Sequence, residues 1–476
     1  MVAKECSISC LQKYRKFSES IHLDLRALAL FRIFAGAVIL CDLAFRYHDL
    51  EAHYTNHGVI PLKFLKELWR NNFAFSFHAW NGSADWQRLL FFIAGLFAVS
   101  FTLGFKTKIS HFATWLLMLS LHSRNSQILF GADTVMRVIL FWSLFLPLAE
   151  KLSIDSWIKK TPPRTMKISN AATFAFLFQM ALIYFFAGFA KIHPVWYREM
   201  SGLQNALNLE QYATPLGQTL VILPTLLKIL TFATFCLELV APFLFFFWFK
   251  NSLFRTMSVF LLILFHAATA LAFSLGIFPF ICSAALIAIL PSSFFGIDSD
   301  SKDYFSGNLT QPLKLFIYAT CFYVLIFNIS NLKFEWKLPF AAQQFAHLTG
   351  LKQRWNLFAP YPDKQSGWFI IEGKNRVGET LTVYDPNTAF LHLPTRANIY
   401  KDARWIKYFM ELRQDRNQKQ RMHFARFVCR QWNRQHSSDE QLIRVSIYSK
   451  FRDTTTVYGG YEVKLAVEQD CGRHQN

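Results

Sequence analysis

Charged residues are scarce in this chain of 476 residues. Asp, Glu, Lys and Arg together make up 17% of the sequence, whereas hydrophobic residues make up 53% and include 52 Phe. A soluble domain typically carries about 25% charged residues. The shortage of charge and the abundance of apolar side chains therefore indicate a protein that is largely embedded in lipid.

The sequence also lacks the motifs of several enzyme classes. It contains no His-Glu-x-x-His metal site, no Walker phosphate-binding loop, no Gly-x-Ser-x-Gly nucleophile motif and no glycine-rich dinucleotide motif. We therefore expect no metal and no water-soluble cofactor, whereas a lipid-soluble cofactor entering from the bilayer stays compatible with the sequence. Nucleic acid is not an expected partner, because the 50 Lys and Arg stand in an apolar background.

Long apolar runs predict an all-α polytopic membrane helix bundle, followed by a small C-terminal α+β domain. A helix needs about 20 mostly apolar residues to cross the hydrocarbon layer, which suggests about nine transmembrane helices. The predicted spans cover residues 27–45, 87–105, 109–123, 134–150, 171–190, 228–249, 256–275, 277–292 and 313–332. A further apolar stretch at 216–227 is too short to cross and is expected to be re-entrant or interfacial.

Basic residues cluster in four segments, namely the N-terminus and residues 105–109, 151–167 and 250–255. With nine spans, all four fall on one side of the membrane, which the positive-inside rule identifies as the cytoplasm. The predicted organisation is then a cytoplasmic segment 1–26, a transmembrane domain 27–332 and a non-cytoplasmic domain 333–476.

The C-terminal domain is expected to contain strands at 368–372, 381–384, 442–448 and 461–467, and helices within 402–434. Its helical stretch is rich in cations, and either a solvated helix face or contact with anionic lipid head groups explains them. These cations are Arg404, Lys407, Arg413, Arg416, Lys419, Arg421, Arg426, Arg430 and Arg434. Cys429 and Cys471 can form a disulfide if the domain faces an oxidising compartment, whereas Cys6 and Cys10 lack His partners for a metal.

Ionisable residues inside the predicted spans are costly and therefore informative. Arg32 and Asp42 in the first span are too far apart to pair with each other, so we expect each to pair with another helix. Glu238 is expected to be protonated or paired, and the nearby Pro242 leaves a backbone carbonyl without its helical donor. His266 is either a hydrogen-bonded core residue or part of a proton relay or ligand site.

Lys191 ends the fifth predicted span among apolar neighbours. Removal from water disfavours the charged form of its amine, which could then act as a base or nucleophile. The alternative is a lysine that reaches the head-group layer. Several polar residues are predicted at the same end of the bundle, and their convergence favours a site. They are His122, Arg124, Asn125, Asp133 and Arg137.

A set of short motifs resembles one known family. The motifs are Arg32-Ile33, Asp42-Leu43, Arg46-Tyr47-His48-Asp49-Leu50, Gly131-Ala132-Asp133, Tyr184 to Lys191, Trp196, Glu238 with Pro242, His266, Gly276-Ile277-Phe278-Pro279 and Arg354-Trp355-Asn356-Leu357-Phe358-Ala359-Pro360. Together they resemble the HTTM proteins, the group that includes vitamin K-dependent gamma-glutamyl carboxylase. The resemblance spans about residues 22–375, and the segment after the last span is similar to that of bacterial members, which implies a bacterial inner membrane.

The resemblance implies a membrane enzyme that uses a reduced vitamin K or menaquinone-type quinol, O2 and CO2 at the non-cytoplasmic face. It implies Lys191 as the base and His266 as its catalytic partner. It further implies a pocket formed by Arg124, Asn125, Asp133, Arg137, Tyr184, Trp196 and Glu238. The structural positions would be Arg32, Asp42, Arg46, Asp49, Pro242 and Trp355.

The chain departs from the carboxylase in two ways. It has Ala190-Lys191 where the carboxylase has two adjacent lysines, and its C-terminal domain is much smaller than the lumenal region of the carboxylase. Peptide glutamate is thus only one possible substrate. The alternative is a non-catalytic membrane protein that binds a quinone or lipid, or anchors a partner. A transporter is disfavoured because no inverted repeat is visible.

Overall fold

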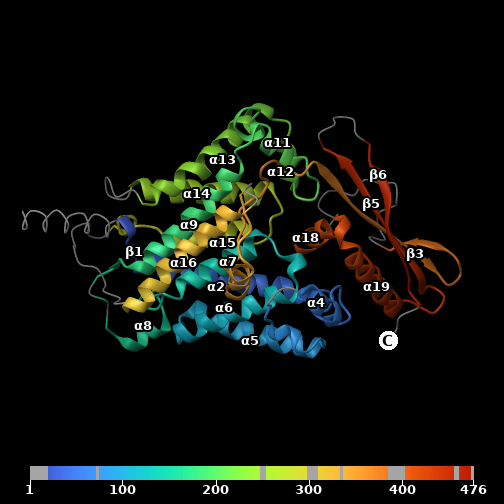
Figure 1. Ribbon diagram of the computed structural model, residues 1–476, viewed down its shortest axis with the longest axis horizontal. Coiled ribbons are helices and arrows are strands. Elements are labelled where there is room, and N and C mark those ends of the chain that lie inside the picture. Colours follow the sequence, from blue (N-terminus) through green and yellow to red (C-terminus); the bar gives the residue numbers. More distant parts are fainter. Residues whose placement is uncertain are drawn as a thin grey trace, which may run out of the picture.

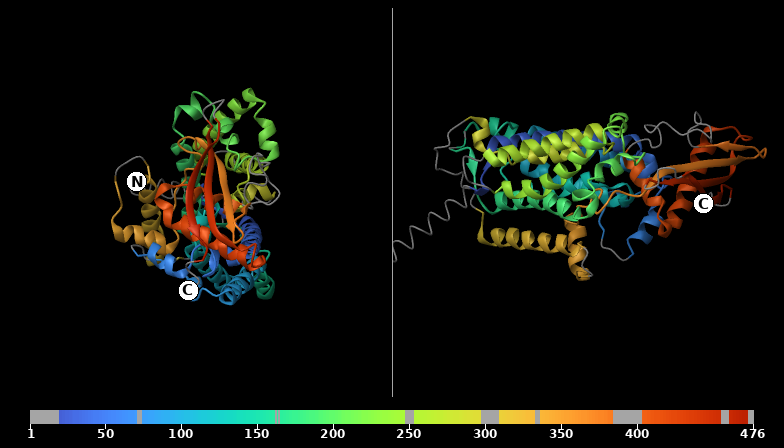
Figure 2. Two further views of the ribbon diagram at one scale, coloured as in Figure 1. Left: turned by 90° about the vertical axis from the view of Figure 1, so that its right-hand side faces the viewer. Right: turned by 90° about the horizontal axis from the view of Figure 1, so that it is seen from above.

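The structure is a computed structural model, and it describes residues 20–70, 74–161, 163, 165–246, 253–296, 309–332, 336–383, 403–454 and 460–472. A helix bundle forms one end of the molecule and a sheet with two helices forms the other (Figures 1 and 2). Cys6, Cys10, Tyr384 and the predicted domain boundary at residue 333 lie outside the described residues.

Among the described residues, six helices are long and apolar enough to cross a membrane, which makes the protein multi-pass. They are α2 (Leu25–His48), α5 (Ala84–Leu103), α9 (Ala171–Ala190), α13 (Pro224–Leu244), α14 (Leu253–Ala272) and α16 (Gln311–Ser330). Each corresponds to one of the predicted spans.

Three predicted spans do not have both the length and the apolar composition needed to cross a membrane. The helix α6 (Thr107–Arg124) is long enough but carries Lys108, Arg124 and two histidines, whereas α7 (Gly131–Ser143) and α15 (Phe278–Ile287) are short. A count of about nine spans therefore stays a prediction.

The helix α9 is the centre of the bundle. Of its most apolar stretch 72% is buried, against 28% to 50% for the other five long helices. Because α9 is apolar on all sides, it is surrounded by protein, and the other helices can present one face to lipid. Its N-terminus is fixed by Asn170, whose side chain accepts hydrogen bonds from the backbone N–H groups of Ala172 and Thr173.

The described parts of the four basic segments share one end of the bundle. There β1 (Leu23–Asp24) pairs with β2 (Lys167–Ile168), and the carboxylate of Asp155 in α8 (Ile154–Lys159) accepts hydrogen bonds from the backbone of Lys106 and Thr107. Arg255 donates to the carbonyl of His22 at 2.8 Å. The C-terminal unit lies at the opposite end, on the right of Figure 1. This grouping is what the positive-inside argument requires, and the compartment each end faces stays a prediction.

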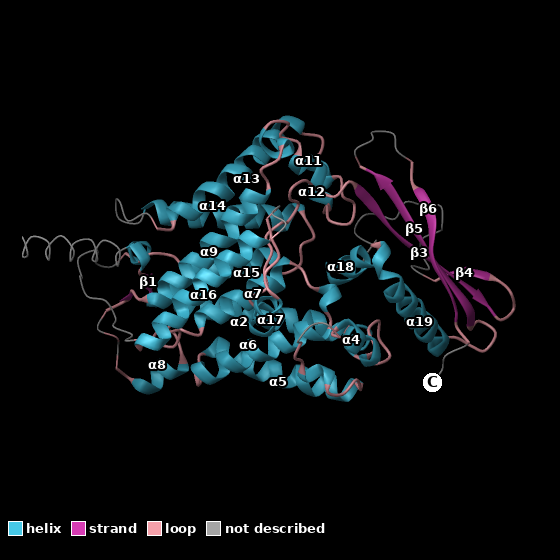
Figure 3. Cartoon of the chain, viewed as in Figure 1, coloured by secondary structure: helices cyan, strands magenta, loops and turns pink. Residues whose placement is uncertain are grey.

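The C-terminal unit is a four-stranded antiparallel sheet with two helices against it (Figure 3). The strand order is β4-β3-β5-β6, formed by β3 (Gln365–Asn375), β4 (Thr380–Thr382), β5 (Leu442–Asp453) and β6 (Glu462–Asp470). The helices are α18 (Ala403–Leu412) and α19 (Gln418–Gln435). The Cys429–Cys471 disulfide ties α19 to the end of β6. The predicted strands and helical stretch therefore all appear, and β3 and β5 are longer than predicted.

Short helices fill the junction between the two ends. They are α3 (Leu50–Tyr54), α4 (Leu62–Leu68), α10 (Pro194–Tyr197), α11 (Gly202–Leu207), α12 (Pro215–Leu220) and α17 (Phe340–Thr349). Single 3-10 turns are formed at η1 (Phe77–Ala79), η2 (Ser126–Ile128), η3 (Ser292–Phe295) and η5 (Asp415–Asn417). The apolar stretch predicted at 216–227 is divided, because α12 ends at Leu220 and α13 begins at Pro224.

Candidate functional site

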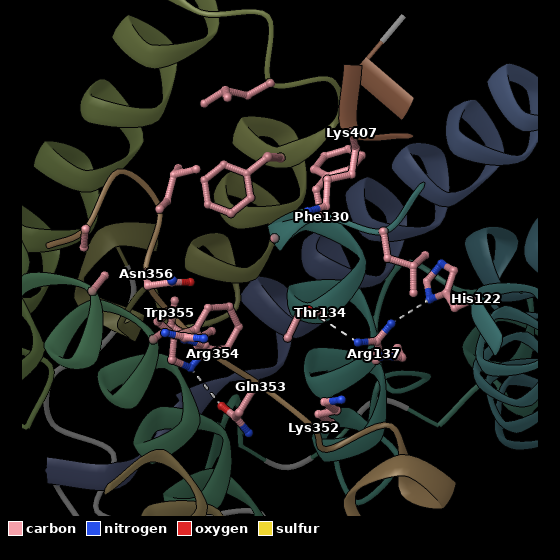
Figure 4. A pocket seen from close by; sticks show the side chains of 18 of the residues that line it. His122, Phe130, Thr134, Arg137, Lys352, Gln353, Arg354, Trp355, Asn356 and Lys407 are labelled. Carbon is pink, nitrogen blue, oxygen red and sulfur yellow. Dashed lines mark hydrogen bonds between the residues drawn. The ribbon is translucent and has the colours of Figure 1, made fainter. Parts of the chain in front are cut away.

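A cavity of about 1020 Å³ lies where the bundle meets the C-terminal unit. Its walls come from α6, α7, α9, α13, α14, α15, the segment 350–363 and the start of α18. A cavity of this size can enclose most of a drug-sized ligand, and ligand sites typically combine apolar walls with a few polar groups. Figure 4 shows part of the wall, with His122, Arg137, Lys352 and Trp355 among the labelled side chains.

Lys191 and Glu238 form a buried pair at the side of this cavity. The amine of Lys191 donates a hydrogen bond to Glu238 Oε2 at 2.8 Å, and it lies 5.2 Å from the centre of the Trp196 ring. Both residues of the pair are buried. Glu238 lines the cavity, and Lys191 is not among the lining residues. The carboxylate therefore stands between the amine and the cavity.

Gly188 allows the helices that carry this pair to approach closely. A Cβ atom added to Gly188 would lie 3.0 Å from the backbone nitrogen of Leu239 and 3.1 Å from the carbonyl carbon of Glu238. The small residue thus lets α13 pack against α9 next to Lys191. One turn later in α13, Pro242 has no N–H to donate to the carbonyl of Glu238.

Tyr184 and His266 form a second buried pair. The Tyr184 hydroxyl and His266 Nε2 are 2.9 Å apart, and both residues line the cavity. Tyr184, Gly188 and Lys191 are spaced four and three residues apart, so they share one face of α9. The other ring nitrogen of His266, Nδ1, is buried and has no hydrogen-bond partner among the described residues.

A buried ionic cluster joins the bundle to the C-terminal unit. Asp42 accepts a hydrogen bond from Arg46 at 2.8 Å, and Asp133 lies 3.1 Å from Arg404 Nη2. Arg46 also bonds to Asp133, Arg404 to Asp42, and Arg46 Nη1 donates to Tyr54 at 2.8 Å. Two carboxylates and two guanidinium groups thus neutralise one another.

Arg404 corrects one prediction from the sequence. The sequence predicts Arg404 on a solvated or lipid-facing helix face, yet the residue is buried inside this ionic cluster. The prediction fails because the cations of α18 and α19 do not share one face. Arg421, for example, donates to the carbonyls of Leu412 and Arg413 instead of facing solvent with a free side chain.

Asp42, Asp133 and His122 also have the composition of a metal site, since one ligand atom from each lies within 4.8 Å of the others. The carboxylates are already bonded to Arg46 and Arg404, and two guanidinium groups would repel a divalent cation. We therefore interpret these residues as an ionic anchor between the two ends of the molecule.

Arg124 and Asn125 do not line the cavity. Arg124 donates to the carbonyl of Ile60 at 2.9 Å, and Asn125 donates to the carbonyl of His53 at 3.1 Å. Asn125 thus holds α3, and Arg124 the loop after it, against the end of α6. Of the residues predicted for the pocket, Arg137, Tyr184 and Glu238 line it, whereas Asp133 and Trp196 stand behind its wall.

Three of the predicted structural residues, Arg32, Asp49 and Trp355, bond to backbone or to a buried amide. Arg32 donates to the carbonyls of Phe101 at 3.1 Å and Leu148 at 3.2 Å. The carbonyl of Asp49 accepts a hydrogen bond from His53 at the turn between α2 and α3. Trp355 donates to Gln353 at 3.0 Å, and Gln353 accepts from Gln179 of α9 at 2.8 Å. This last network holds the segment after α17 against the bundle.

Trp196 anchors the same segment at a second point, because its Nε1 donates to the carbonyl of Pro360 at 2.9 Å. The segment brings Lys352 and Arg354 to the cavity, and α18 brings Lys407. The sequence places none of these three residues in the predicted pocket. The sequence offers one weak indication of their role: Arg354 is the first residue of the motif that resembles HTTM proteins, and Lys352 lies two residues before it.

Comparison with known proteins gives one match. A family model described as the HTTM domain matches residues 22–293, which is more than half of the chain. The matched region contains Lys191, Glu238 and His266, and it ends before Lys352, Arg354 and α18. Neither the comparison with curated proteins nor that with solved structures found a match.

Proposed function

Because the chain belongs to the HTTM domain family, we propose that it is a membrane enzyme related to vitamin K-dependent gamma-glutamyl carboxylase. In this proposal the Lys191–Glu238 pair accepts a proton from a hydroxyl group of a reduced quinone in the cavity. The observation that carries the proposal is the position of Glu238, which lines the cavity and accepts a 2.8 Å hydrogen bond from the Lys191 amine.

Burial favours proton transfer within the Lys191–Glu238 pair. Away from water, a charged ammonium–carboxylate pair loses much of its advantage over a neutral amine beside a carboxylic acid. In the neutral form, Glu238 passes its proton to Lys191 while it receives one from the ligand hydroxyl. The ligand then carries the negative charge and Lys191 the positive charge. Lys191 thereby acts as the base through Glu238, which the resemblance alone did not imply.

The cavity has the features that a quinone ring needs. Tyr184, His266 and Phe278 supply ring faces and edges, with the His266 and Phe278 rings 5.8 Å apart. The Tyr184–His266 pair adds polar atoms to this wall, which can bond a quinone oxygen. A bound reduced quinone supplies the electrons for reaction with O2. Carboxylation of a peptide glutamate by CO2 is the final step of the proposal.

The proposal places the cavity at the non-cytoplasmic side of a bacterial inner membrane, with the N-terminus in the cytoplasm and lipids around the bundle. The Cys429–Cys471 disulfide supports this orientation, because disulfides persist in oxidising compartments. The basic segments at the opposite end support it as well.

The test uses the full-length protein in lipid nanodiscs with reduced menaquinone, O2 and isotopically labelled hydrogencarbonate. We expect quinol-dependent oxygen consumption that falls about 100-fold or more in Lys191→Ala and Glu238→Gln, as is usual for loss of a proton-transfer group. Lys228→Ala is the matched control, because Lys228 is an exposed lysine on the same helix as Glu238. If the wild-type protein shows neither oxygen consumption nor CO2 fixation, the proposed enzymatic activity is refuted.

A non-catalytic role is the second candidate, in which the protein binds a quinone or lipid or anchors a partner. It is favoured by the fact that Lys191 does not line the cavity and is already bonded to Glu238. In that case Lys191→Ala leaves the cellular role intact. Changes at Trp355 or Phe358, which hold the segment beside the cavity, abolish it.

A further inference from the structure

Arg137 is a cation of the cavity wall without an anion of its own. Its guanidinium group contacts Thr134 Oγ1 and His122 Nδ1, both at 3.3 Å, and the carbonyl of Gly350 at 3.4 Å. All three partners are neutral acceptors at long distances. Among the described residues, no carboxylate lies within ion-pair distance of Arg137. Two of its five N–H groups therefore remain for a ligand.

Lys352 lies beside Arg137 and is in the same situation. The carbonyl that Arg137 contacts belongs to Gly350, two residues before Lys352, and Figure 4 shows both cations in one part of the cavity. The Lys352 amine is 3.3 Å from His347 Nε2, and within the described parts of the chain it forms no ion pair. Burial and then the charge of Arg137 lower the pKa of Lys352. Burial, and then Lys352 and Arg137, lower the pKa of His347 to about 4.

The anions near the cavity are already neutralised. Of the described residues, two carboxylates line it, and Glu238 pairs with Lys191 while Asp363 pairs with Arg413. Lys407 also has a partner, Glu411. The positive charge of Arg137 and Lys352 is therefore not neutralised, and neither is that of Arg354, which also lines the cavity and forms no ion pair among the described residues. Arg137 is only partly exposed, so its charge, with that of the exposed Lys352 beside it, favours a ligand that brings negative charge.

The rest of this wall is apolar. Phe130, Phe265, Leu275 and Phe278 line the same cavity as the two cations. The Phe278 ring lies against the start of α7, because a Cβ atom on Gly131 would be 3.0 Å from it. A small hydrophilic anion would leave the cavity-facing surface of these side chains uncovered. A ligand with an apolar portion would cover them and gain the free energy of burying that surface.

We propose that Arg137 and Lys352 bind the negatively charged oxygens of an anionic amphiphile, with its apolar portion against Phe130 and Phe278. The charged group is a carboxylate or a phosphate, since both offer oxygens that a guanidinium group binds well. This ligand class differs from a neutral quinol. Lys352 also lies beyond the matched family region, which ends at residue 293. The proposal does not depend on quinol chemistry.

The test measures binding of the fluorescent fatty acid cis-parinaric acid to the full-length protein in zwitterionic nanodiscs. Empty nanodiscs give the background. Unlabelled oleate, dioctanoyl phosphatidic acid and the neutral oleyl alcohol serve as competitors. We expect saturable binding above background that an anionic competitor displaces and oleyl alcohol does not. Displacement by oleate alone assigns a carboxylate ligand, and displacement by the phosphatidic acid alone assigns a phosphate head group. Displacement by both retains the oxyanion site for either source.

Variants locate the site. Lys352→Gln and Arg137→Gln should each weaken binding about tenfold, the loss expected for one charge-assisted contact. Lys352 is exposed on its segment, so its variant is expected to fold even if the Arg137 variant does not. Lys108→Gln, an exposed lysine at the other end of the bundle, is the matched control and should bind as the wild type. Equal displacement by oleyl alcohol, or unchanged affinity in Lys352→Gln, overturns the proposal. No step of the assay involves turnover, so failure of the enzyme hypothesis would leave it unaffected.

Discussion

Arg404 and Asp42 form a buried ion pair although 362 positions separate them in the sequence. Asp42 belongs to the first helix of the bundle and Arg404 to the C-terminal unit. The same guanidinium group reaches Asp133 at 3.1 Å. The position of the C-terminal unit over the cavity therefore depends on a charge inserted into the bundle. Because the cluster is neutral only with Arg404 in place, docking of this unit and charge balance inside the bundle are coupled.

Loss of Arg404 should release the C-terminal unit. Arg404→Ala leaves two buried carboxylates with Arg46 alone, and removal of one partner from a buried ion pair typically costs about 3–5 kcal/mol. We expect faster limited proteolysis between the bundle and the sheet, and a lower melting temperature in nanodiscs. Arg416→Ala, which removes an exposed cation near the same helices, should change neither measurement. Equal protease resistance of the Arg404 variant and the wild type would show that other contacts hold the unit.

Gly188 should be intolerant of even one additional carbon. The Cβ atom of Gly188→Ala would press on the backbone of Leu239 at 3.0 Å and separate the helices that carry Lys191 and Glu238. Overpacking of this kind typically costs about 1–3 kcal/mol. A melting experiment measures it. Gly95→Ala is the control, because no atom lies within 4 Å of its added Cβ and alanine favours a helix. A Gly188 variant as stable as the Gly95 variant contradicts the close packing of α9 and α13.

The Cys429–Cys471 disulfide should stabilise the C-terminal unit. It links residues 42 positions apart, and disulfides that close loops of such length typically contribute about 2–4 kcal/mol. We expect a lower denaturation midpoint for the Cys429→Ser/Cys471→Ser double variant, and a matching decrease when the wild type is reduced. Cys41→Ser removes an exposed thiol outside the disulfide and serves as control. If reducing agent leaves the wild-type midpoint unchanged, the disulfide does not stabilise the folded protein.

Mild acid should loosen the junction between the two ends. Burial, more than neighbouring charges, lowers the pKa of His347 and of His423 to about 4. An unfolded histidine has a pKa of about 6.5, so the unfolded chain binds more protons between these values. Stability contributed by the neutral rings is then present above about pH 6.5 and is lost as the pH falls toward 4. Because both side chains are partly exposed, we expect about 1 kcal/mol or less from each.

His423→Gln tests this pH dependence without touching the cavity. The His423 ring stacks on Phe64 of α4 with centroids 4.4 Å apart. We expect the melting temperature of this variant to fall less than that of the wild type between pH 7 and pH 5. His436→Gln is the comparison, because that histidine stacks on Trp432 within the C-terminal unit and does not bridge the two ends. A steeper or unchanged pH dependence in the His423 variant rules out this contribution.

The sequence by itself determined the membrane bundle and the elements of the C-terminal unit. The six long apolar helices form most of their backbone hydrogen bonds within themselves, and the composition of each is apolar enough to enter lipid. The same local logic identified Lys191, Glu238 and His266, because a polar side chain is costly in an apolar run whatever its partner is.

Only the tertiary structure decided which of these groups meet. Lys191 bonds to Glu238 because Gly188 lets two helices approach, and the pairing is not visible in either helix alone. Lys352 reaches Arg137 because the segment after α17 folds back onto the bundle. Partition into lipid is a property of single segments, whereas ion pairs and cavities arise from the packing of segments that are distant in the chain.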